Sequence, residues 1–568
     1  MPVITLYEKR FSKFLGREIT VKELVRQLPW IGFDIEEIGE DYVKVEYNPN
    51  RIDFCSYAGV ARALKGFIEL EEGIPKYNAE EPKITLFVDG AVAEIRPFML
   101  AAVVRNIRLD EDSVVELMEM QEDLHWGIGR NRKKVSIGIH NLDIVKPPFT
   151  YTAVKPTSVK FVPLGKTEEM NLKEILEKHE KGIAYRHIID WSPKYPLLID
   201  NDGAVLSMPP IINGELTRVS SETRNLFLDV TGTRYEAVEK SLNILSTALA
   251  DMGGTIEKVY VKYPDKTVIS PNLEPEKMKL RIDYANKLLG LKLSEDEAIK
   301  CLHRCRLDAE KLENGVLEVY FPAYRTDIIH EADLVEEVAI GYGYYRLKPT
   351  IPSAITVGEQ HQTNKLANTV RQIMVGLGYL EVMNFTLTNE RIHYDFMRMK
   401  LQKPVKLANP VSKEYTIMRQ FLLPGLMKNL AENKHESYPQ KLFEVSDIAR
   451  INLRLETKCE RRLHVAAVSA HSTANYTEAK STVEALLSNL GLKNWQIKPA
   501  KHPSFLDGRT VTIHIKNKQV GVLGEIHPEV LNNFEVENPT AAFEIDLETL
   551  TPKTAENKAN NNPNSVKS

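Results

Sequence analysis

The sequence predicts an α+β protein built from several domains, and three observations lead to this fold class. The chain has 568 residues, and a domain usually holds about 150, so three to five separately cored units are expected. Segments with strand-type patterning alternate with segments whose apolar residues recur at helical spacing. Shifts in this patterning and a charged, proline-containing link separate the units, and the expected domains are 1–83, 84–270, 271–350 and 351–550.

The composition is that of an ordinary globular protein. Apolar residues make up 43% of the chain and the net charge is −4, without the basic excess that is usual in nucleic-acid binders. The longest apolar runs, such as 99–104, are far shorter than the roughly 20 residues that span a bilayer. The N-terminus lacks a secretory signal, and four scattered cysteines are typical of a reducing compartment. We therefore expect a cytoplasmic protein with no membrane role.

The first domain, 1–83, is expected to mix helices and strands. A helix is predicted near 21–28 and a strand over 43–47. The loop 48–53 then leads into a second helix from about Ser56 to Phe67. Apolar residues recur along that helix at helical spacing and form a stripe that should be buried: Tyr57, Val60, Ala61, Leu64 and Phe67.

The second domain, 84–270, is expected to be rich in strands. Asp202-Gly203 lies between two apolar runs, which is a strong signal for a hairpin turn. The apolar run LFLDVTGT ends at Thr233, and Glu236 follows three residues later. This spacing predicts a capping box and a helix that starts after Thr233.

The last two domains carry more helix. The domain 271–350 is predicted to be small and helical, of a winged type. The domain 351–550 should open with a helix that stops at Gly378 and should close with an edge strand, AAFEIDL, over 541–547. Residues 551–568 are rich in Asn and lack aromatic side chains, so we predict a disordered tail.

Two short patterns suggest ligand sites. Gly127-Ile128-Gly129 follows a predicted helix and lacks a third glycine, so a dinucleotide site is not expected. The basic loop that comes next is either a phosphate contact or a solvated turn: Arg130, Arg132, Lys133 and Lys134.

Cys301, His303 and Cys305 raise the question of a metal. Ser294 and Glu297 form a second capping box. The helix that follows places both cysteines on an apolar stripe, so buried structural cysteines are favoured.

The segment from Asp327 to Glu337 holds five acidic residues and no Lys or Arg. If it is helical from Asp333 onward, Asp333, Glu336 and Glu337 share one face and repel one another. A nearby positive charge should offset that repulsion. Clustered carboxylates suit Mg²⁺, and a solvated acidic face is the alternative.

Four separated stretches of the sequence follow one another in the order found in one protein family. They are NPNRIDFCSYAGVARAL, then VLSMPPIINGEL with SSETRNLFLDVTGT, then RTDIIHEADLVEEVAIGYGY, and finally MRQFLLPGLMKNLAENKH with KLFEVSD and GEIHPEVL. Over roughly residues 1–550 the chain resembles the beta subunit of phenylalanyl-tRNA synthetase in its shorter archaeal and eukaryotic-cytosolic form. Bacterial-type beta chains carry two further domains, for which this length leaves no room.

The resemblance implies an (αβ)₂ heterotetramer that attaches phenylalanine to tRNA(Phe) with ATP and Mg²⁺. ATP would be used by the alpha subunit, and no cofactor-binding residue is assigned to this chain. The last domain would be a catalytically inactive class II synthetase-like antiparallel sheet that packs against alpha, since a Gly-x-Gly-x-x-Arg signature is missing from 360–550. The third domain would correspond to B5. Its matching positions for Mg²⁺ are Asp327, Asp333, Glu336 and Glu337, with Glu331 left out.

The second domain resembles the editing (B3/B4-like) domain, which hydrolyses mischarged Tyr-tRNA(Phe). A pocket that fits a phenyl ring rejects the same ring with a hydroxyl only about 10²-fold, so a second site must recognise that hydroxyl. The polar positions expected to line it are Ser207, Asp229 and Thr231, with Leu198 as a wall. Their alternative role is ordinary turn and strand-end chemistry.

Two other functions stay open at this level. The chain would be a scaffold that binds tRNA and alpha without editing, if its second domain has lost hydrolysis. A stand-alone Mg²⁺-dependent phosphohydrolase is disfavoured, because His330 is the one nearby base.

Overall fold

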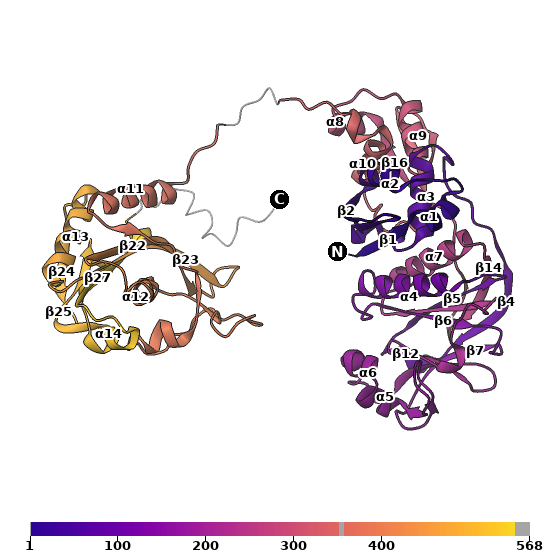
Figure 1. Cartoon of the computed structure of the whole chain (residues 1–568), viewed down its shortest axis with the longest axis horizontal. Helices are drawn as coiled ribbons and strands as arrows, with labels where there is room; N and C mark the ends of the chain where they lie inside the picture. Colours follow the sequence, from indigo (N-terminus) through magenta and orange to yellow (C-terminus); the bar gives the residue numbers. More distant parts are fainter. Residues whose placement is uncertain (1, 352–356, 551–568) are drawn as a thin grey trace. The chain divides into compact units, whose positions relative to one another are not determined.

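The computed structural model describes residues 2–351 and 357–550. The chain forms two compact units, Met1–Ile351 and Pro352–Ser568, each with its own helices and sheets (Figure 1). The predicted α+β multidomain class is therefore confirmed, and the finer division into four domains stays a prediction. The predicted disordered tail lies outside the described residues. In the described parts, no helix is both long and apolar enough to cross a membrane.

The first unit begins with a small antiparallel sheet in the order β1-β3-β2, covered by helices. Apolar residues at helical spacing on α3 are buried as expected, and Ser56 caps this helix. The elements are β1 (Val3–Tyr7), α1 (Glu8–Leu15), α2 (Val21–Gln27), β2 (Phe33–Ile38), β3 (Tyr42–Tyr47) and α3 (Tyr57–Phe67).

The end of the first unit repeats this topology. Its sheet has the matching order β16-β18-β17, and again a strand is followed by two helices, two strands and a last helix. The elements are β16 (Glu276–Arg281), α8 (Ile282–Leu289), α9 (Glu295–Arg304), β17 (Asp308–Lys311), β18 (Val316–Phe321) and α10 (Glu331–Tyr342). The chain thus contains two copies of one strand-helix-helix-strand-strand-helix motif.

The two copies share local chemistry as well. A left-handed glycine ends the first helix of each, Gly16 in one and Gly290 in the other, because this conformation is costly for other residues. Four residues later, a capping box opens the second helix, with Thr20 and Glu23 in the first copy. Ser294 and Glu297 form the matching box in the second, as predicted.

A clasp of arginine and aspartate precedes the last helix in each copy. Arg51 donates to both carboxylate oxygens of Asp53 at 2.9 Å, and Arg325 donates to both oxygens of Asp327 at 2.8 and 2.6 Å. The clasps lie side by side, because Thr326 Oγ1 donates to Asn50 O at 2.8 Å. The two copies therefore pack on each other through these clasps.

A ten-stranded sheet lies between the two copies in sequence, in the order β12-β11-β10-β7-β4-β14-β5-β13-β6, with β15 on β14. Helices α4 and α7 lie along it (Figure 1). The main strands and helices are β4 (Ala79–Val88), β5 (Phe98–Arg105), α4 (Glu111–Trp126), β6 (Val135–Asn141), β7 (Phe149–Val154), α5 (Leu172–Lys178), α6 (Glu180–Tyr185), β10 (Tyr195–Ile199), β11 (Val205–Met208), β12 (Ile212–Asn213), β13 (Leu226–Gly232), α7 (Tyr235–Asp251), β14 (Thr255–Lys262) and β15 (Thr267–Ser270).

One local prediction in this sheet is wrong. Helix α7 begins at Tyr235, and Arg234 occupies the N-cap position without a side-chain hydrogen bond. Thr233 does not cap the helix, because its backbone N–H donates to Lys134 O at 3.0 Å and extends the pairing of β13. The predicted hairpin is confirmed, with β10 and β11 paired antiparallel across Gly203, which is left-handed.

The second unit is a seven-stranded sheet in the order β19-β22-β23-β27-β26-β25-β24, with α11 and α13 packed on one core and α12 and α14 on another. Its AAFEIDL strand is central and not at an edge as predicted, because β23 and β26 flank it. The elements are α11 (Gln362–Gly376), β19 (Leu380–Glu381), β20 (Leu387–Thr388), β21 (Ile417–Met418), α12 (Leu423–Glu432), β22 (Gln440–Ile451), β23 (Cys459–Ala470), α13 (Tyr476–Asn489), β24 (Trp495–Pro499), β25 (Phe505–Ile515), β26 (Lys518–Ile526), α14 (Pro528–Phe534) and β27 (Thr540–Asp546).

Candidate functional site

A buried polar network lies inside the ten-stranded sheet. His140 on β6 places Nε2 2.7 Å from Asp229 Oδ1 on β13 and Nδ1 2.7 Å from Thr217 Oγ1. All three residues are at most 1% exposed. An ionised carboxylate only accepts hydrogen bonds, so Nε2 carries a proton, and in the neutral ring Nδ1 accepts from the hydroxyl. The ring is thus held in one orientation between a base and a hydroxyl.

Small neighbours make room for this network. In register, Asp229 lies between Ala101 on β5 and Gly138 on β6. A Cβ atom at Gly138 would lie 1.9 Å from Asp229 Oδ1 and 2.6 Å from His140 Nε2. Only glycine at this position leaves space for both the carboxylate and the imidazole.

Thr231 belongs to a second cluster built on Arg96. The Arg96 guanidinium donates to Thr231 Oγ1 and to Thr231 O, both at 2.9 Å. Burial of the guanidinium lowers the pKa of Arg96 to about 10, against the opposing effects of Tyr151 and Asp229. The electrostatic effect of Asp229 on Arg96 connects the two clusters.

Ser207 lies opposite Leu198 in the antiparallel pair of β10 and β11. Both are buried, and Ser207 Oγ lacks a hydrogen-bond partner among the described residues. A buried hydroxyl without a partner costs about 1–3 kcal/mol. Its donor and acceptor capacity is therefore free for a ligand.

Sequence reasoning placed Ser207 on the hairpin and Asp229 and Thr231 at the end of LFLDVTGT, and the structure has them in β11 and β13. Sequence reasoning missed their partners. The structure joins Asp229 to His140, and Thr231 to Arg96, and it joins Ser207 to neither. His140 is the next-to-last residue of β6, and a polar side chain in a mostly apolar strand was the one available signal. Nothing local in the sequence marks Arg96.

The network reaches a cavity of about 540 Å³ through Thr217. Cavities of this size hold small organic groups. Its wall is mainly apolar on the side of α4, with Val114, Leu117, Met118 and Gln121, and is completed by residues that include Ile139, Leu164, Asn213 and Thr217.

The basic loop, residues 130–134, divides into an outer and an inner part. Arg130 and Lys133 are exposed, whereas Arg132 is 6% exposed and donates to Ile211 O at 2.9 Å and to Glu122 at 2.7 Å. The prediction that Arg132 contacts solvent or phosphate is therefore wrong. Its side chain is a structural anchor.

Arg325 supplies the positive charge that the acidic segment required. In addition to Asp327, its guanidinium donates to Glu337 at 2.6 and 3.2 Å. Burial opposes ionisation of Asp327, yet Arg325 overcomes it and lowers the pKa of Asp327 to about 2. Arg325 lies two residues before the acidic window, as the first residue of the RTDIIHEADLVEEVAIGYGY stretch.

The other two predicted metal ligands, Asp333 and Glu336, have different surroundings. Asp333 Oδ2 accepts from the backbone N–H groups of Ile329 and His330 and caps α10. Glu336 is the most exposed carboxylate of the set, and loss of part of its hydration together with the neighbouring carboxylates raises its pKa. Asp333, Glu336 and Glu337 lie at i, i+3 and i+4 of α10 and so share one side of the helix as predicted, although each has a different environment. As placed in the described residues, no three such side chains form a metal site.

The cysteines of α9 are structural, as favoured. Cys301 is buried, and Cys305 Sγ donates to Glu337 O at 3.2 Å. His303 pairs with Asp308 at 3.4 Å instead of turning toward either cysteine.

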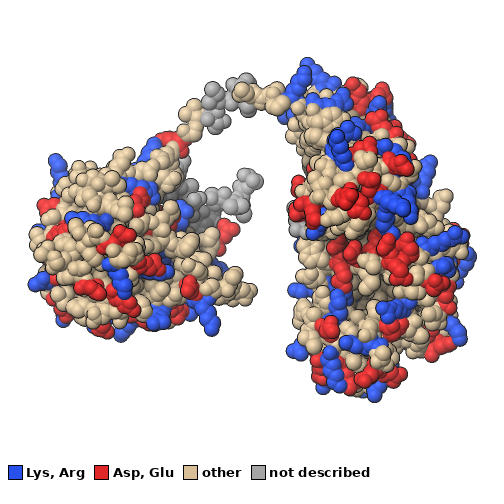
Figure 2. All heavy atoms as spheres, in the orientation of Figure 1, with Lys and Arg blue, Asp and Glu red and all other residues tan. Residues whose placement is uncertain are grey.

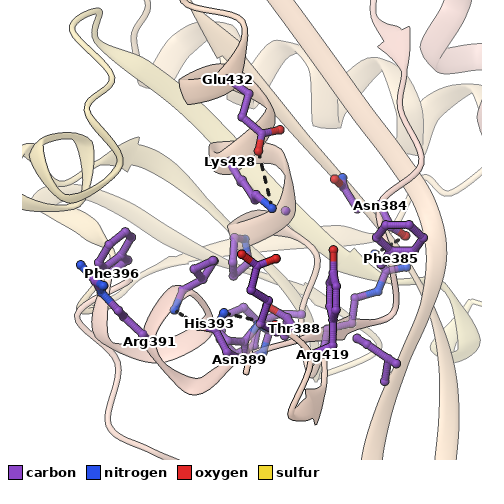
Figure 3. Close-up of a pocket in the computed structure, with 17 residues that line it drawn as sticks. Asn384, Phe385, Thr388, Asn389, Arg391, His393, Phe396, Arg419, Lys428 and Glu432 are labelled. Carbon is purple, nitrogen blue, oxygen red and sulfur yellow. Dashed lines mark hydrogen bonds and ion pairs between the residues drawn. The ribbon is translucent and has the colours of Figure 1, made fainter. Parts of the chain in front are cut away.

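The second unit has a cavity of about 550 Å³ beside α12 (Figure 3). At its wall, Arg419 is buried and pairs with Glu444 at 2.7 Å. His393 stacks on Phe421 with ring centroids 3.9 Å apart, and burial lowers the pKa of His393 to about 3. Lys428 lies 3.5 Å from Glu432. The cavity's one buried guanidinium is thus already held by a carboxylate.

Comparisons with known proteins cover nearly the whole chain. The sequence model of the tRNA synthetase B5 domain matches residues 278–344, and that of the phenylalanyl tRNA synthetase beta chain CLM domain matches residues 347–547. A phenylalanine–tRNA ligase beta subunit of Methanosarcina barkeri is 46% identical over 97% of this chain and 99% of its own length. The corresponding protein of Archaeoglobus fulgidus is 44% identical over 96% and 98%.

A solved structure agrees with these relatives. The N-terminal fragment of the phenylalanyl-tRNA synthetase beta subunit from Pyrococcus horikoshii is 40% identical, with a TM-score of 0.58. The match covers 60% of this chain and 99% of the fragment. The resemblance found in four sequence stretches is thereby confirmed, and the chain belongs to the family of phenylalanine–tRNA ligase beta subunits.

Proposed function

We propose that the chain supports ATP-dependent attachment of phenylalanine to tRNA(Phe) by an alpha subunit and hydrolyses mischarged Tyr-tRNA(Phe). The observation that carries the editing role is the buried network of Asp229, His140 and Thr217 at the wall of a cavity. A phenyl pocket rejects tyrosine poorly, so the charging enzyme needs such a second site.

The network has the parts that ester hydrolysis requires. Asp229 orients the His140 ring, and His140 reaches the cavity through the Thr217 hydroxyl. A water that attacks the ester carbonyl passes its proton along Thr217 to His140. The ester bond breaks, and the proton returns to the departing ribose oxygen. Ser207, whose hydroxyl is free, and Thr231 stay the proposed recognition positions, with Leu198 as a wall.

The second unit is proposed as an inactive class II synthetase-like core that packs against alpha in an (αβ)₂ heterotetramer. Large apolar side chains near its first strands are unusually exposed: Leu380 at 67%, Met383 at 91%, Phe385 at 76% and Val411 at 106%. Exposed apolar groups of this kind mark protein interfaces. Its buried Arg419 is already neutralised by Glu444, which leaves it unavailable to a nucleotide.

Mg²⁺ binding by Asp327, Asp333, Glu336 and Glu337 stays a proposal. The donors have the right chemistry, although two are held by Arg325 and one caps a helix. The first copy of the motif supports a role beyond folding. Gly59, Arg62 and Ala63 follow the capping residue Ser56 at the spacings at which Asp333, Glu336 and Glu337 follow His330, so the motif folds without these acids.

Cellular location follows the same reasoning. The four cysteines are free, as is usual in a reducing compartment, and we place the protein in the cytoplasm.

Lys and Arg are interspersed with Asp and Glu over the visible face of each unit (Figure 2).

The decisive experiment is deacylation of Tyr-tRNA(Phe) by the complex with alpha. The unaltered complex should hydrolyse it, and Asp229→Ala should lower the rate by about 10²-fold or more, since orientation of the base is lost. Charging with phenylalanine should stay near the unaltered rate. Equal deacylation rates would favour the alternative, a scaffold that binds alpha and tRNA without editing.

A further inference from the structure

The basic loop is attached directly to the strand of the proposed editing site. Thr233 N donates to Lys134 O at 3.0 Å. From the interior, Arg96 donates to Thr231 Oγ1 and also to Arg132 O at 3.1 Å. Any group held on the outer side of this loop is therefore close to the end of β13.

The backbone of the loop is strained. Arg130, Asn131 and Arg132 have φ angles of 49°, 51° and 65°, which non-glycine residues rarely adopt in succession. Such strain persists only where the surroundings impose it, and it gathers at ligand sites. Arg96 and the buried guanidinium of Arg132 impose it here. The result is that Arg130 and Lys133 point to solvent on a rigid support.

The segments next to the loop carry exposed aromatic side chains. Trp126 ends α4 just before the loop and is 46% exposed, and Trp191 is 61% exposed. The segment that leads to Trp191 is tied to the loop, because the Arg132 guanidinium lies 4.7 Å from the Tyr185 ring centroid. Exposed rings beside cations bind single-stranded nucleic acid by base stacking and phosphate contacts.

We propose that the basic loop and Trp126 bind the single-stranded 3′ end of a charged tRNA on its way to the cavity. Arg130 and Lys133 contact phosphates, and Trp126 stacks on a base. This inference deepens the proposed editing function and rests on it for the direction of the strand. A ligand with both phosphates and bases uses the two exposed cations and the exposed indole together.

The test uses the complex with alpha and Tyr-tRNA(Phe). For the double variant R130A/K133A, the half-saturating tRNA concentration should rise about tenfold, and the slope of log affinity against log salt should fall by about two. The effect should fall on this concentration more than on the rate at saturation. Trp126→Ala should raise the half-saturating tRNA concentration about fivefold or more. The control K292A/K300A removes two exposed lysines of the second motif copy. It should change neither the half-saturating tRNA concentration nor the salt slope.

Binding of uncharged tRNA separates this inference from the editing proposal. Intact tRNA(Phe) should bind R130A/K133A more weakly than the unaltered complex, whereas tRNA without its unpaired 3′ nucleotides should bind both equally. An equal loss for both tRNAs, or no loss for either, overturns the inference. If the unaltered complex fails to hydrolyse Tyr-tRNA, the editing proposal fails, but a loss confined to intact tRNA still supports the loop contact.

Discussion

Arg325 holds Glu337 by two hydrogen bonds, and both residues are less than 5% exposed. Arg325→Met removes the cation shared by Glu337 and Asp327 and leaves the buried Glu337 without its ion-pair partner, which should lower the free energy of unfolding by about 3–5 kcal/mol. Urea unfolding followed by circular dichroism measures this. Arg281→Met is the matched control: Arg281 pairs with Glu331 at the surface, so its loss should matter far less. If both variants lose the same free energy of unfolding, burial does not determine how much the Arg325 ion pairs stabilise the protein.

Gly138→Ala should slow editing strongly. The added methyl group would overlap Asp229 Oδ1, so the carboxylate must move away from His140. Deacylation of Tyr-tRNA should fall about as far as in Asp229→Ala, by about 10²-fold. Glycine-to-alanine at Gly165, where a Cβ meets no atom within 4 Å, controls for a general cavity effect, although its positive φ adds strain. A Gly138→Ala enzyme that deacylates normally would exclude the network from catalysis.

His140 and Thr217 should act as one unit. Because the proton path uses both, His140→Ala and Thr217→Val should each slow deacylation strongly, and the double variant should be little slower than the slower single variant. Single-turnover rates on preformed Tyr-tRNA give the comparison. Additive losses in log rate would mean that the two side chains act independently.

Glu336→Ala should remove bound Mg²⁺ from the complex with alpha, since Glu336 is the exposed carboxylate of the set. Metal analysis after equilibrium dialysis provides the stoichiometry. Glu331→Gln is the control, because Glu331 is engaged with Arg281 and lies outside the proposed ligands. Unchanged stoichiometry in Glu336→Ala would remove this residue from the site.

Acid should destabilise the second unit through His393. Burial lowers the pKa of His393 to about 3, below the roughly 6.5 of an unfolded histidine. The unfolded state therefore binds the proton more readily, and stability falls as pH drops below about 6.5, by about 2 kcal/mol at pH 5. His393→Gln should show a shallower loss between pH 7 and 5 in thermal unfolding. His435→Gln, at an exposed position, should retain the full pH dependence.

Much of the fold could be predicted because its signals are local. The capping box of Ser294 and Glu297, the buried stripe of α3 and the hairpin turn at Gly203 depend on residues within a few positions of each other. The capping box predicted at Thr233 does not form, because a backbone group distant in sequence, Lys134 O, accepts a hydrogen bond from the Thr233 N–H. The prediction that AAFEIDL is an edge strand is wrong because strand order depends on pairing across the whole unit.

The site was only half predictable for the same reason. Asp229 could be proposed because its segment resembles part of an editing domain, in which a polar residue must recognise the tyrosine hydroxyl. Its partner His140 is 89 residues away, and only the register of β6 against β13 brings them together. The pairing of Arg325 with the acids was missed because Arg325 precedes the Asp327–Glu337 window, although its spacing to Asp327 repeats that of Arg51 to Asp53.

The duplicated motif has a consequence for synthesis on the ribosome. The surface of the first copy is completed only when Thr326 reaches Asn50, 276 residues later. At 5–20 residues per second, that surface stays uncovered for roughly 14 to 55 s. Chains stalled before β16 should then be cut by protease near α3, while completed chains resist. Protection of stalled chains would mean that the first copy matures without its twin.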